Sequence, residues 1–200
     1  FGYLNMDPYR SPTHALLKPL ALVAFGLTAK LFARDATRHE RLGLAGAVAL
    51  SSLAKPSLAI CLLPAALVLG AWYRLSGGRL HLGHLIGAVV VPSAVILAWQ
   101  YAFYFGAAGR SEIIFAPLLV VGHYATGLFS KFLMSILLPL TVLLLYRRHA
   151  VADSEIQLAC LQFAFAVGYT NLLAETRDTM AGNFAGTATI AHSLITEAPL

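Results

Sequence analysis

Long apolar runs recur along this 200-residue chain with little polar sequence between them. They occupy about 14–33, 42–54, 57–75, 85–105, 129–146 and 156–174, and a further run begins near 184. A helix that crosses a bilayer needs about 20 apolar residues. Only 12% of the residues are charged, against roughly 25% in soluble domains. With a mean hydropathy of +0.74, the chain is predicted to be an all-α, polytopic integral membrane bundle of about six spans.

One apolar stretch and the two chain ends need separate interpretation. The stretch 113–127 is interrupted by Pro117, Gly122 and His123, so we interpret it as an interfacial or re-entrant segment. No repeat or low-complexity linker marks a boundary, so residues 1–200 are treated as a single transmembrane domain. The chain opens with Phe1 rather than Met and ends soon after a new apolar run has begun, so we expect a fragment of a longer chain.

Basic residues in the short loops predict the orientation, because cytoplasmic loops carry an excess of them. One set of alternate loops carries seven: Arg34, Arg38, Arg41, Arg74, Arg79, Arg147 and Arg148. The other set carries four: Arg10, Lys55, Arg110 and Arg177. Adding the lysines at span ends narrows the difference to eight against six. The bias places residues 1–13 outside the cytoplasm in a multi-pass protein of the cytoplasmic (inner) membrane, and the short basic clusters do not suggest nucleic-acid binding.

The first group of candidate site residues stands at the start of the first apolar run. Ser11 and Pro12 form a helix start, with serine as the N-cap and proline at the first helical position. His14 and Lys18 are then four residues apart on one helix face. Together with Arg10 they could bind a phosphate beside the helix N-terminus. The alternative is that Lys18 reaches lipid headgroups and His14 is interfacial.

Lys55 is the second candidate. The apolar run before it has 13 residues, which cover only about 20 Å of a hydrocarbon core of about 30 Å. A lysine below the membrane surface needs a carboxylate, a carbonyl or a lipid phosphate as partner. Pro56 is expected to end one helix and start the next. We therefore expect Lys55 to contact substrate, with a lysine that merely reaches the surface as the alternative.

The third group follows the sixth run and includes Glu175, Arg177, Asp178 and Asn183. An acid can act as a base, arginine can bind an anion and an amide can bind sugar hydroxyls. The alternative is a solvated loop with a local ion pair. Glu175 differs from the others because it directly follows an apolar run and needs a partner there.

Two stretches, residues 5–19 and 50–56, resemble parts of polytopic bacterial membrane glycosyltransferase-like proteins of the GT-C type. One runs from Asn5 to Thr13 and leads into Leu17-Lys18-Pro19, similar to an outer loop that enters a helix. The other is Leu50-Ser51-Ser52-Leu53-Ala54-Lys55-Pro56, which resembles an L-x-x-L-x-K-P helix junction of such proteins. Together these stretches cover about a tenth of the chain.

The resemblance implies transfer of a sugar from a polyprenyl-phosphate-linked donor on the non-cytoplasmic face of the membrane. The family's expected base is an acid in the first outer loop, for which Asp7 is offered as a substitute. The resulting hypothesis assigns phosphate binding to Arg10, His14, Lys18 and Lys55, and the base to Asp7 or Glu175. A divalent metal could bind beside Asp7, although no ligand set requires one. The alternatives are a transporter or lipid flippase and a non-catalytic membrane subunit, with membrane lipid as a partner in each case.

Overall fold

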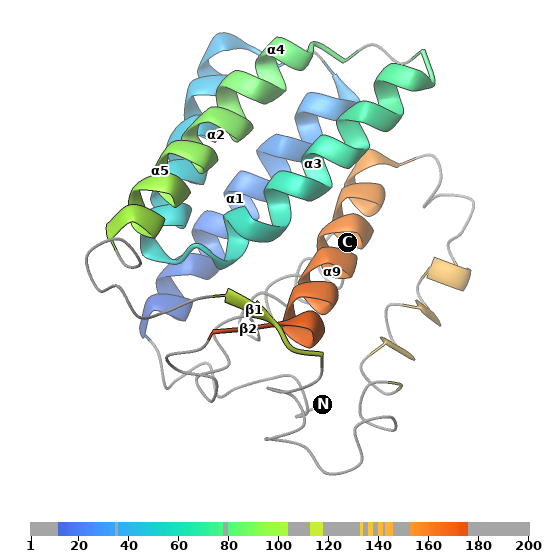
Figure 1. The fold of residues 1–200 in the computed structure, drawn as a ribbon. Helices are drawn as coiled ribbons and strands as arrows, with labels where there is room; N and C mark the ends of the chain where they lie inside the picture. The colour runs from blue at the N-terminus through green and yellow to red at the C-terminus, as the bar shows by residue number, and fades with distance from the viewer. Residues whose placement is uncertain are drawn as a thin grey trace.

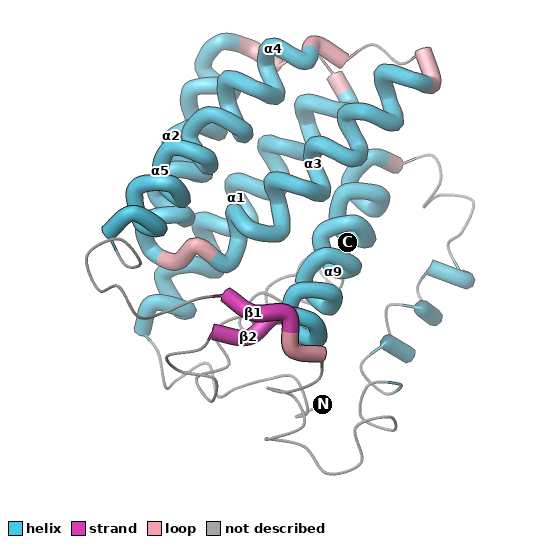
Figure 2. Tube along the Cα trace, in the orientation of Figure 1, coloured by secondary structure: helices cyan, strands magenta, loops and turns pink. Residues whose placement is uncertain are grey.

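The computed structural model describes residues 12–34, 36–77, 80–103, 113–117 and 153–175, with separate helical positions between 133 and 145. The side chains of residues 12–16, Ala174 and Glu175 lie outside this description. Most of the described residues are helical, as the sequence predicts. The helices lie side by side in one bundle, with a small pair of strands at one end (Figures 1 and 2). In chain order, the elements are α1 (Pro12–Ala33), α2 (Arg38–Ala54), α3 (Ser57–Leu75), α4 (Leu82–Leu85), η2 (Ile86–Val90), α5 (Val91–Tyr101), β1 (Ile113–Phe115), α9 (Ser154–Leu172) and β2 (Leu173–Glu175).

The helix boundaries follow the apolar runs with three informative differences. Helix α3 covers the predicted run 57–75, whereas α2 begins four residues before its run, at Arg38. The predicted run 156–174 ends as a helix at Leu172, and its last residues join β2. Ile113 begins the other strand, β1, so the start of the segment expected to be interfacial or re-entrant is extended. The run that begins near 184 lies outside the described residues.

Two of the described helical stretches are long and apolar enough to cross a membrane. They are α3 and the continuous helix formed by α4, η2 and α5, which covers Leu82–Tyr101. This second helix contains a π-helical stretch at Ile86–Val90, just before Pro92. Proline has no backbone N–H, and its ring crowds the carbonyl four residues earlier. Widening of the helix ahead of Pro92 relieves that conflict without ending the helix.

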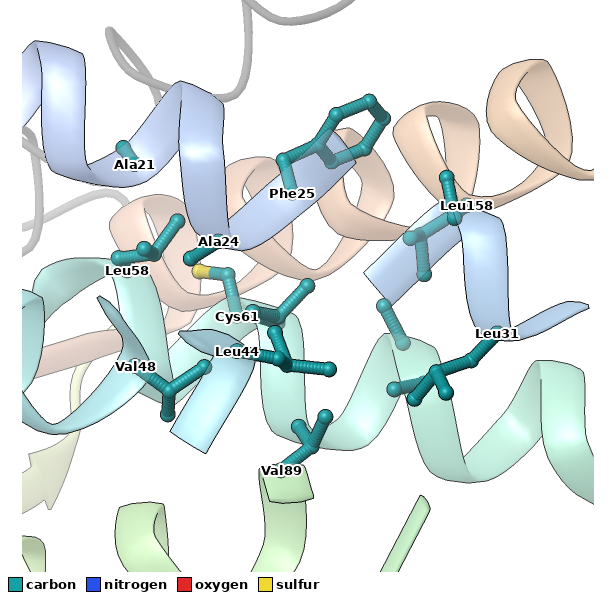
Figure 3. Packing of buried hydrophobic residues seen from close by; sticks show 14 of the residues in the cluster. Ala21, Ala24, Phe25, Leu31, Leu44, Val48, Leu58, Cys61, Val89 and Leu158 are labelled. Atoms are coloured by element: carbon teal, nitrogen blue, oxygen red, sulfur yellow. The ribbon is translucent and has the colours of Figure 1, made fainter. Parts of the chain in front are cut away.

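The core lies where α1, α2, α3 and α9 meet. Helix α1 packs most extensively against α2, and α3 packs mainly against α9. Figure 3 shows Cys61 of α3 facing Ala24 of α1 and Leu44 of α2, within a cluster of buried side chains. Neither Cys61 nor Cys160 forms a disulfide bond. Many of the buried residues are alanines, which allow helix axes to approach closely.

Four buried hydroxyl groups in this bundle bond to carbonyls of their own helices. Thr28 donates to the Ala24 carbonyl at 2.6 Å, and Thr170 donates to the Ala166 carbonyl at 2.8 Å. Ser51 and Ser52 both donate to the Val48 carbonyl. Hydroxyls that bond back to the preceding turn need no water, so they can be buried at little cost.

The turn between α1 and α2 is organised by Glu40. Thr37 caps α2: its hydroxyl accepts from the Glu40 N–H, and its own N–H donates to Glu40 Oε2 at 2.9 Å. Arg34 also donates to the Glu40 carboxylate. The Thr37 N–H and the Arg34 guanidinium lower the pKa of Glu40 to about 2. The carboxylate therefore ties the end of α1 to the start of α2.

We predict that this turn makes the bundle acid-sensitive. The pKa of Glu40 is lowered to about 2 in the folded state. The ionised carboxylate therefore stabilises the fold at pH values above the ordinary pKa of a glutamate, and this stabilisation is lost as the pH falls towards 2. Glu40→Gln should lower Tm at pH 7, and the difference from the wild type should shrink between pH 5 and pH 2. Circular dichroism of the detergent-solubilised protein measures both. Parallel pH profiles of the two proteins would contradict the assignment.

A second prediction concerns the close approach of α3 and α4 at Gly70. A Cβ atom at this position would lie 2.8 Å from Leu85 Cδ2. Gly70→Leu should therefore destabilise the protein by about 1–3 kcal/mol through overpacking. Gly46→Leu is the matched control, because a Cβ there meets no atom within 4 Å and leucine favours a helix over glycine. Thermal unfolding in one detergent compares the two, and equal Tm values would refute the close contact.

Candidate functional site

Charged side chains of the described helices lie towards the two ends of the bundle. One end includes the α1–α2 turn and the last turn of α3, with Lys30, Arg34, Arg38, Arg41 and Arg74. We call the other end the junction end: it contains the start of α1, the link between α2 and α3, the last turn of α5 and the β1–β2 pair (Figure 1). Large exposed side chains between the ends are apolar, including Leu67, Val68, Val91 and Val95.

Lys55 is held between two helices at the junction end. It follows the last residue of α2 in an extended conformation, with φ −163° and ψ 129°. Its N–H donates to the Ser51 carbonyl at 2.9 Å, so the backbone at this residue is fixed. The side chain is half-buried, and this burial lowers the pKa of the Lys55 ammonium. A partly desolvated cation of this kind binds an anion more strongly than a fully hydrated lysine does.

The depth of Lys55 comes from packing as well as from the length of its helix. Helix α2 has 17 residues, which at about 1.5 Å each extend about 26 Å, although its first turn is polar. Helix length alone therefore does not bury the lysine. Pro56 is the N-cap of α3, and the Lys55 side chain beside it is half-buried.

Gln100 is the residue at this junction that the sequence analysis missed. Within a helix, the Ser52 carbonyl would accept a hydrogen bond from the N–H of residue 56, but residue 56 is proline. The Gln100 side chain takes this place, because its Nε2 donates to the Ser52 carbonyl at 2.9 Å. Gln100 precedes the last residue of α5, so it links two helices across the junction. The available signal was an isolated amide near the end of an apolar run.

The start of α1 agrees with the sequence prediction at Pro12. The helix begins there and continues through Pro19 to Ala33, which preserves the four-residue spacing of His14 and Lys18 along one helix. The Lys18 side chain is exposed, whereas the neighbouring Leu17 is fully buried. Lys18 therefore stands on the outer surface of α1 near the junction end, and the side chain of His14 lies outside the described residues.

The β1–β2 pair places Glu175 at the same end of the bundle. The strands are antiparallel, with Ile113 opposite Glu175 and Phe115 opposite Leu173. The Ala116 N–H also donates to the Leu172 carbonyl at 2.9 Å, which extends the pairing to the end of α9. The chain after α5 is thus joined to the chain after α9 beside the junction (Figure 2).

The predicted site residues divide into two groups. The structure brings Lys18, Lys55 and the backbone of Glu175 to the junction end (Figure 1). Asp7, Arg10, Arg177 and Asn183 lie outside the described residues, so their predicted roles stay predictions. Within the described ranges no group of three or more His, Cys, Asp or Glu side chains could hold a metal ion.

Comparisons with known proteins complete the description of the site. The chain matched no protein-family model, no curated protein and no solved structure. Its functional assignment therefore depends on the chemistry of the junction end.

Proposed function

We propose that this chain is the membrane part of a glycosyltransferase of the GT-C type that uses a polyprenyl-phosphate-linked sugar donor. The observation that carries the proposal is the half-buried cation at a proline-broken helix junction, Lys55 before Pro56. Such a cation can bind a phosphate at the level of the lipid headgroups, where the phosphate of a polyprenyl donor resides. The other described residues of the junction end are consistent with this role.

Membrane insertion is the first part of the proposal. Helix α3 has 19 residues, which extend about 28 Å, close to the thickness of the hydrocarbon core. Its exposed side chains include Leu67 and Val68, and those of α5 include Val91 and Val95. Aromatic side chains stand at different ends: Trp72 near the end of α3, and Trp99 stacked on Phe103 near the junction end. This spacing suits two membrane interfaces, and the finer proposal is a multi-pass inner-membrane bundle of about six spans.

Orientation is the second part. Among the described residues, the end opposite the junction end carries more basic side chains: Lys30, Arg34, Arg38, Arg41 and Arg74. Cytoplasmic segments next to spans carry such an excess. The junction end then faces away from the cytoplasm, together with residues 1–13. A donor phosphate would approach Lys55 and Lys18 from that side.

In the proposed mechanism the basic residues bind the phosphate and an acidic residue acts as the base. Lys55 and Lys18, with Arg10 and His14, neutralise the phosphate that departs as the sugar–phosphate bond breaks. Asp7 or Glu175 accepts the proton of the acceptor hydroxyl as the new glycosidic bond forms. Arg177 and Asn183 would bind the phosphate and the sugar hydroxyls. A divalent metal beside Asp7 is compatible with this scheme but not required by it.

Transport or lipid flipping is the second candidate function, and two observations favour it. The helix Leu82–Tyr101 contains the π-helical stretch before Pro92, and transporters often use irregular helices at their binding sites. Gln162 of α9 is also buried, with no hydrogen bond to Oε1 from any described residue. Against transport, the buried hydroxyls of Thr28 and Thr170 bond to their own helices and do not line a polar path. A non-catalytic subunit would show neither activity.

Substitution of the lysines tests the transfer reaction. Lys55→Met in the full-length protein should lower kcat for transfer from a polyprenyl-phosphate-linked sugar by about 10²-fold, because it removes one group that stabilises the departing phosphate. Lys18→Met should act in the same direction. Lys30→Met is the matched control, because Lys30 is an exposed lysine in the last turn of α1 at the other end. Transfer is measured in proteoliposomes with labelled donor, and unchanged turnover of the Lys55 variant would refute the role.

Thiol labelling tests the orientation. With the native cysteines replaced by alanine, Tyr101→Cys at the junction end should react with a membrane-impermeant maleimide in intact cells. Thr37→Cys at the α1–α2 turn should react only after permeabilisation, because this turn is proposed to be cytoplasmic. The reverse pattern would invert the orientation, and equal labelling in intact cells would argue against membrane insertion.

A further inference from the structure

The link between α2 and α3 carries an unusual hydrogen-bond requirement. Pro56 removes the N–H that would satisfy the Ser52 carbonyl, and the next residue along the chain, Leu53, is exposed at the end of α2. The donor comes from Gln100, which is 48 residues away in sequence. In an apolar environment an unpaired carbonyl is costly. The Gln100 side chain therefore allows α2 to end before Pro56 without leaving the Ser52 carbonyl unpaired.

The orientation of the Gln100 amide follows from its partner. A carbonyl oxygen can only accept, so the Nε2 atom must face Ser52 and the Oε1 atom must point elsewhere. Oε1 is buried and has no hydrogen-bond partner among the described residues. A leucine would avoid this unpaired acceptor, so the amide is useful here for the bond that Nε2 makes.

We infer that Gln100 is a positioning residue for Lys55: by holding the Ser52 carbonyl, it sets where the Lys55 ammonium meets the substrate phosphate. The geometry supports this in two steps. The Lys55 N–H is bonded to Ser51, and the next carbonyl, that of Ser52, is bonded to Gln100. Two consecutive carbonyls of the last helical turn are therefore fixed, and Lys55 follows the second of them by three residues.

The inference has one part that depends on the proposed function and one that does not. Contact of Lys55 with a donor phosphate depends on the transferase assignment. Control of the Lys55 environment by Gln100 is a property of the fold and can be measured without any substrate. Loss of the Ser52 bond should loosen the junction and hydrate the ammonium, which burial now keeps partly out of water.

The test compares Gln100→Leu with Gln162→Leu in the full-length protein in lipid nanodiscs. Gln162 is the matched control because it is a buried glutamine of α9 whose side chain makes no bond to the Lys55 link. Amine-reactive labelling of Lys55 across a pH series, read by mass spectrometry, gives the midpoint of its deprotonation. Hydrogen exchange of peptides that cover 51–57 gives the mobility of the junction. Gln100→Met is a second variant in case the leucine variant does not fold.

Gln100→Leu should move the Lys55 midpoint upward, towards the ordinary lysine value of about 10.4, and raise exchange at 51–57 by about tenfold, the equivalent of one hydrogen bond of average strength. Gln162→Leu should do neither, although it can lower Tm. The inference is overturned if the Gln100 variants leave the deprotonation midpoint of Lys55 unchanged, or if Gln162→Leu shifts that midpoint by the same amount. If Gln100→Leu shifts the Lys55 midpoint but the wild-type protein transfers no sugar from a polyprenyl-phosphate-linked donor, the positioning role stands and the transferase assignment fails.

Discussion

The requirement that every buried backbone carbonyl and N–H find a partner within the protein explains most of this bundle. In apolar surroundings water cannot supply the missing bonds, so most of the apolar sequence in the described residues is helical. At two of the prolines this regular hydrogen bonding is interrupted. At Pro92 the helix widens into a π-helical stretch, and at Pro56 it ends and a side chain from another helix supplies the lost donor. Both departures follow from the absence of a single N–H group.

Buried hydroxyls can meet the same requirement within a single helix. Thr28, Ser51, Ser52 and Thr170 bond to carbonyls of their own helices, so they contribute little to contacts between helices. Gln100 is different because its bond crosses from α5 to the end of α2. A side chain that fixes a break between two helices also controls the residue at that break. In this protein the residue is Lys55, the described cation that burial affects most directly.

The charged side chains of the described helices lie at the two ends of the bundle, and the exposed side chains between the ends are mostly apolar. Arg34, Thr37 and Glu40 form a compact polar network at one end, where Thr37 and Glu40 make the capping box of α2 and Glu40 also pairs with Arg34. The junction end instead combines a half-buried lysine, an exposed lysine and the end of a strand that carries Glu175. The first arrangement satisfies its own charges and so serves stability. The second places a half-buried lysine beside a break in the backbone, and the proposed phosphate binding is based on this arrangement.

The sequence by itself determined the helices, because apolar runs and prolines act locally. Run 57–75 became α3, Pro12 began α1, and Pro56 separated α2 from α3. Lys55 could be selected for the same reason, since its position depends on adjacent residues. Only the tertiary structure decided that Gln100 bonds to Ser52, that residues 113–115 pair with 173–175, and that α3 approaches α4 at Gly70. These contacts join residues far apart in the chain and depend on how side chains of different helices fit together, which hydrophobic periodicity does not encode.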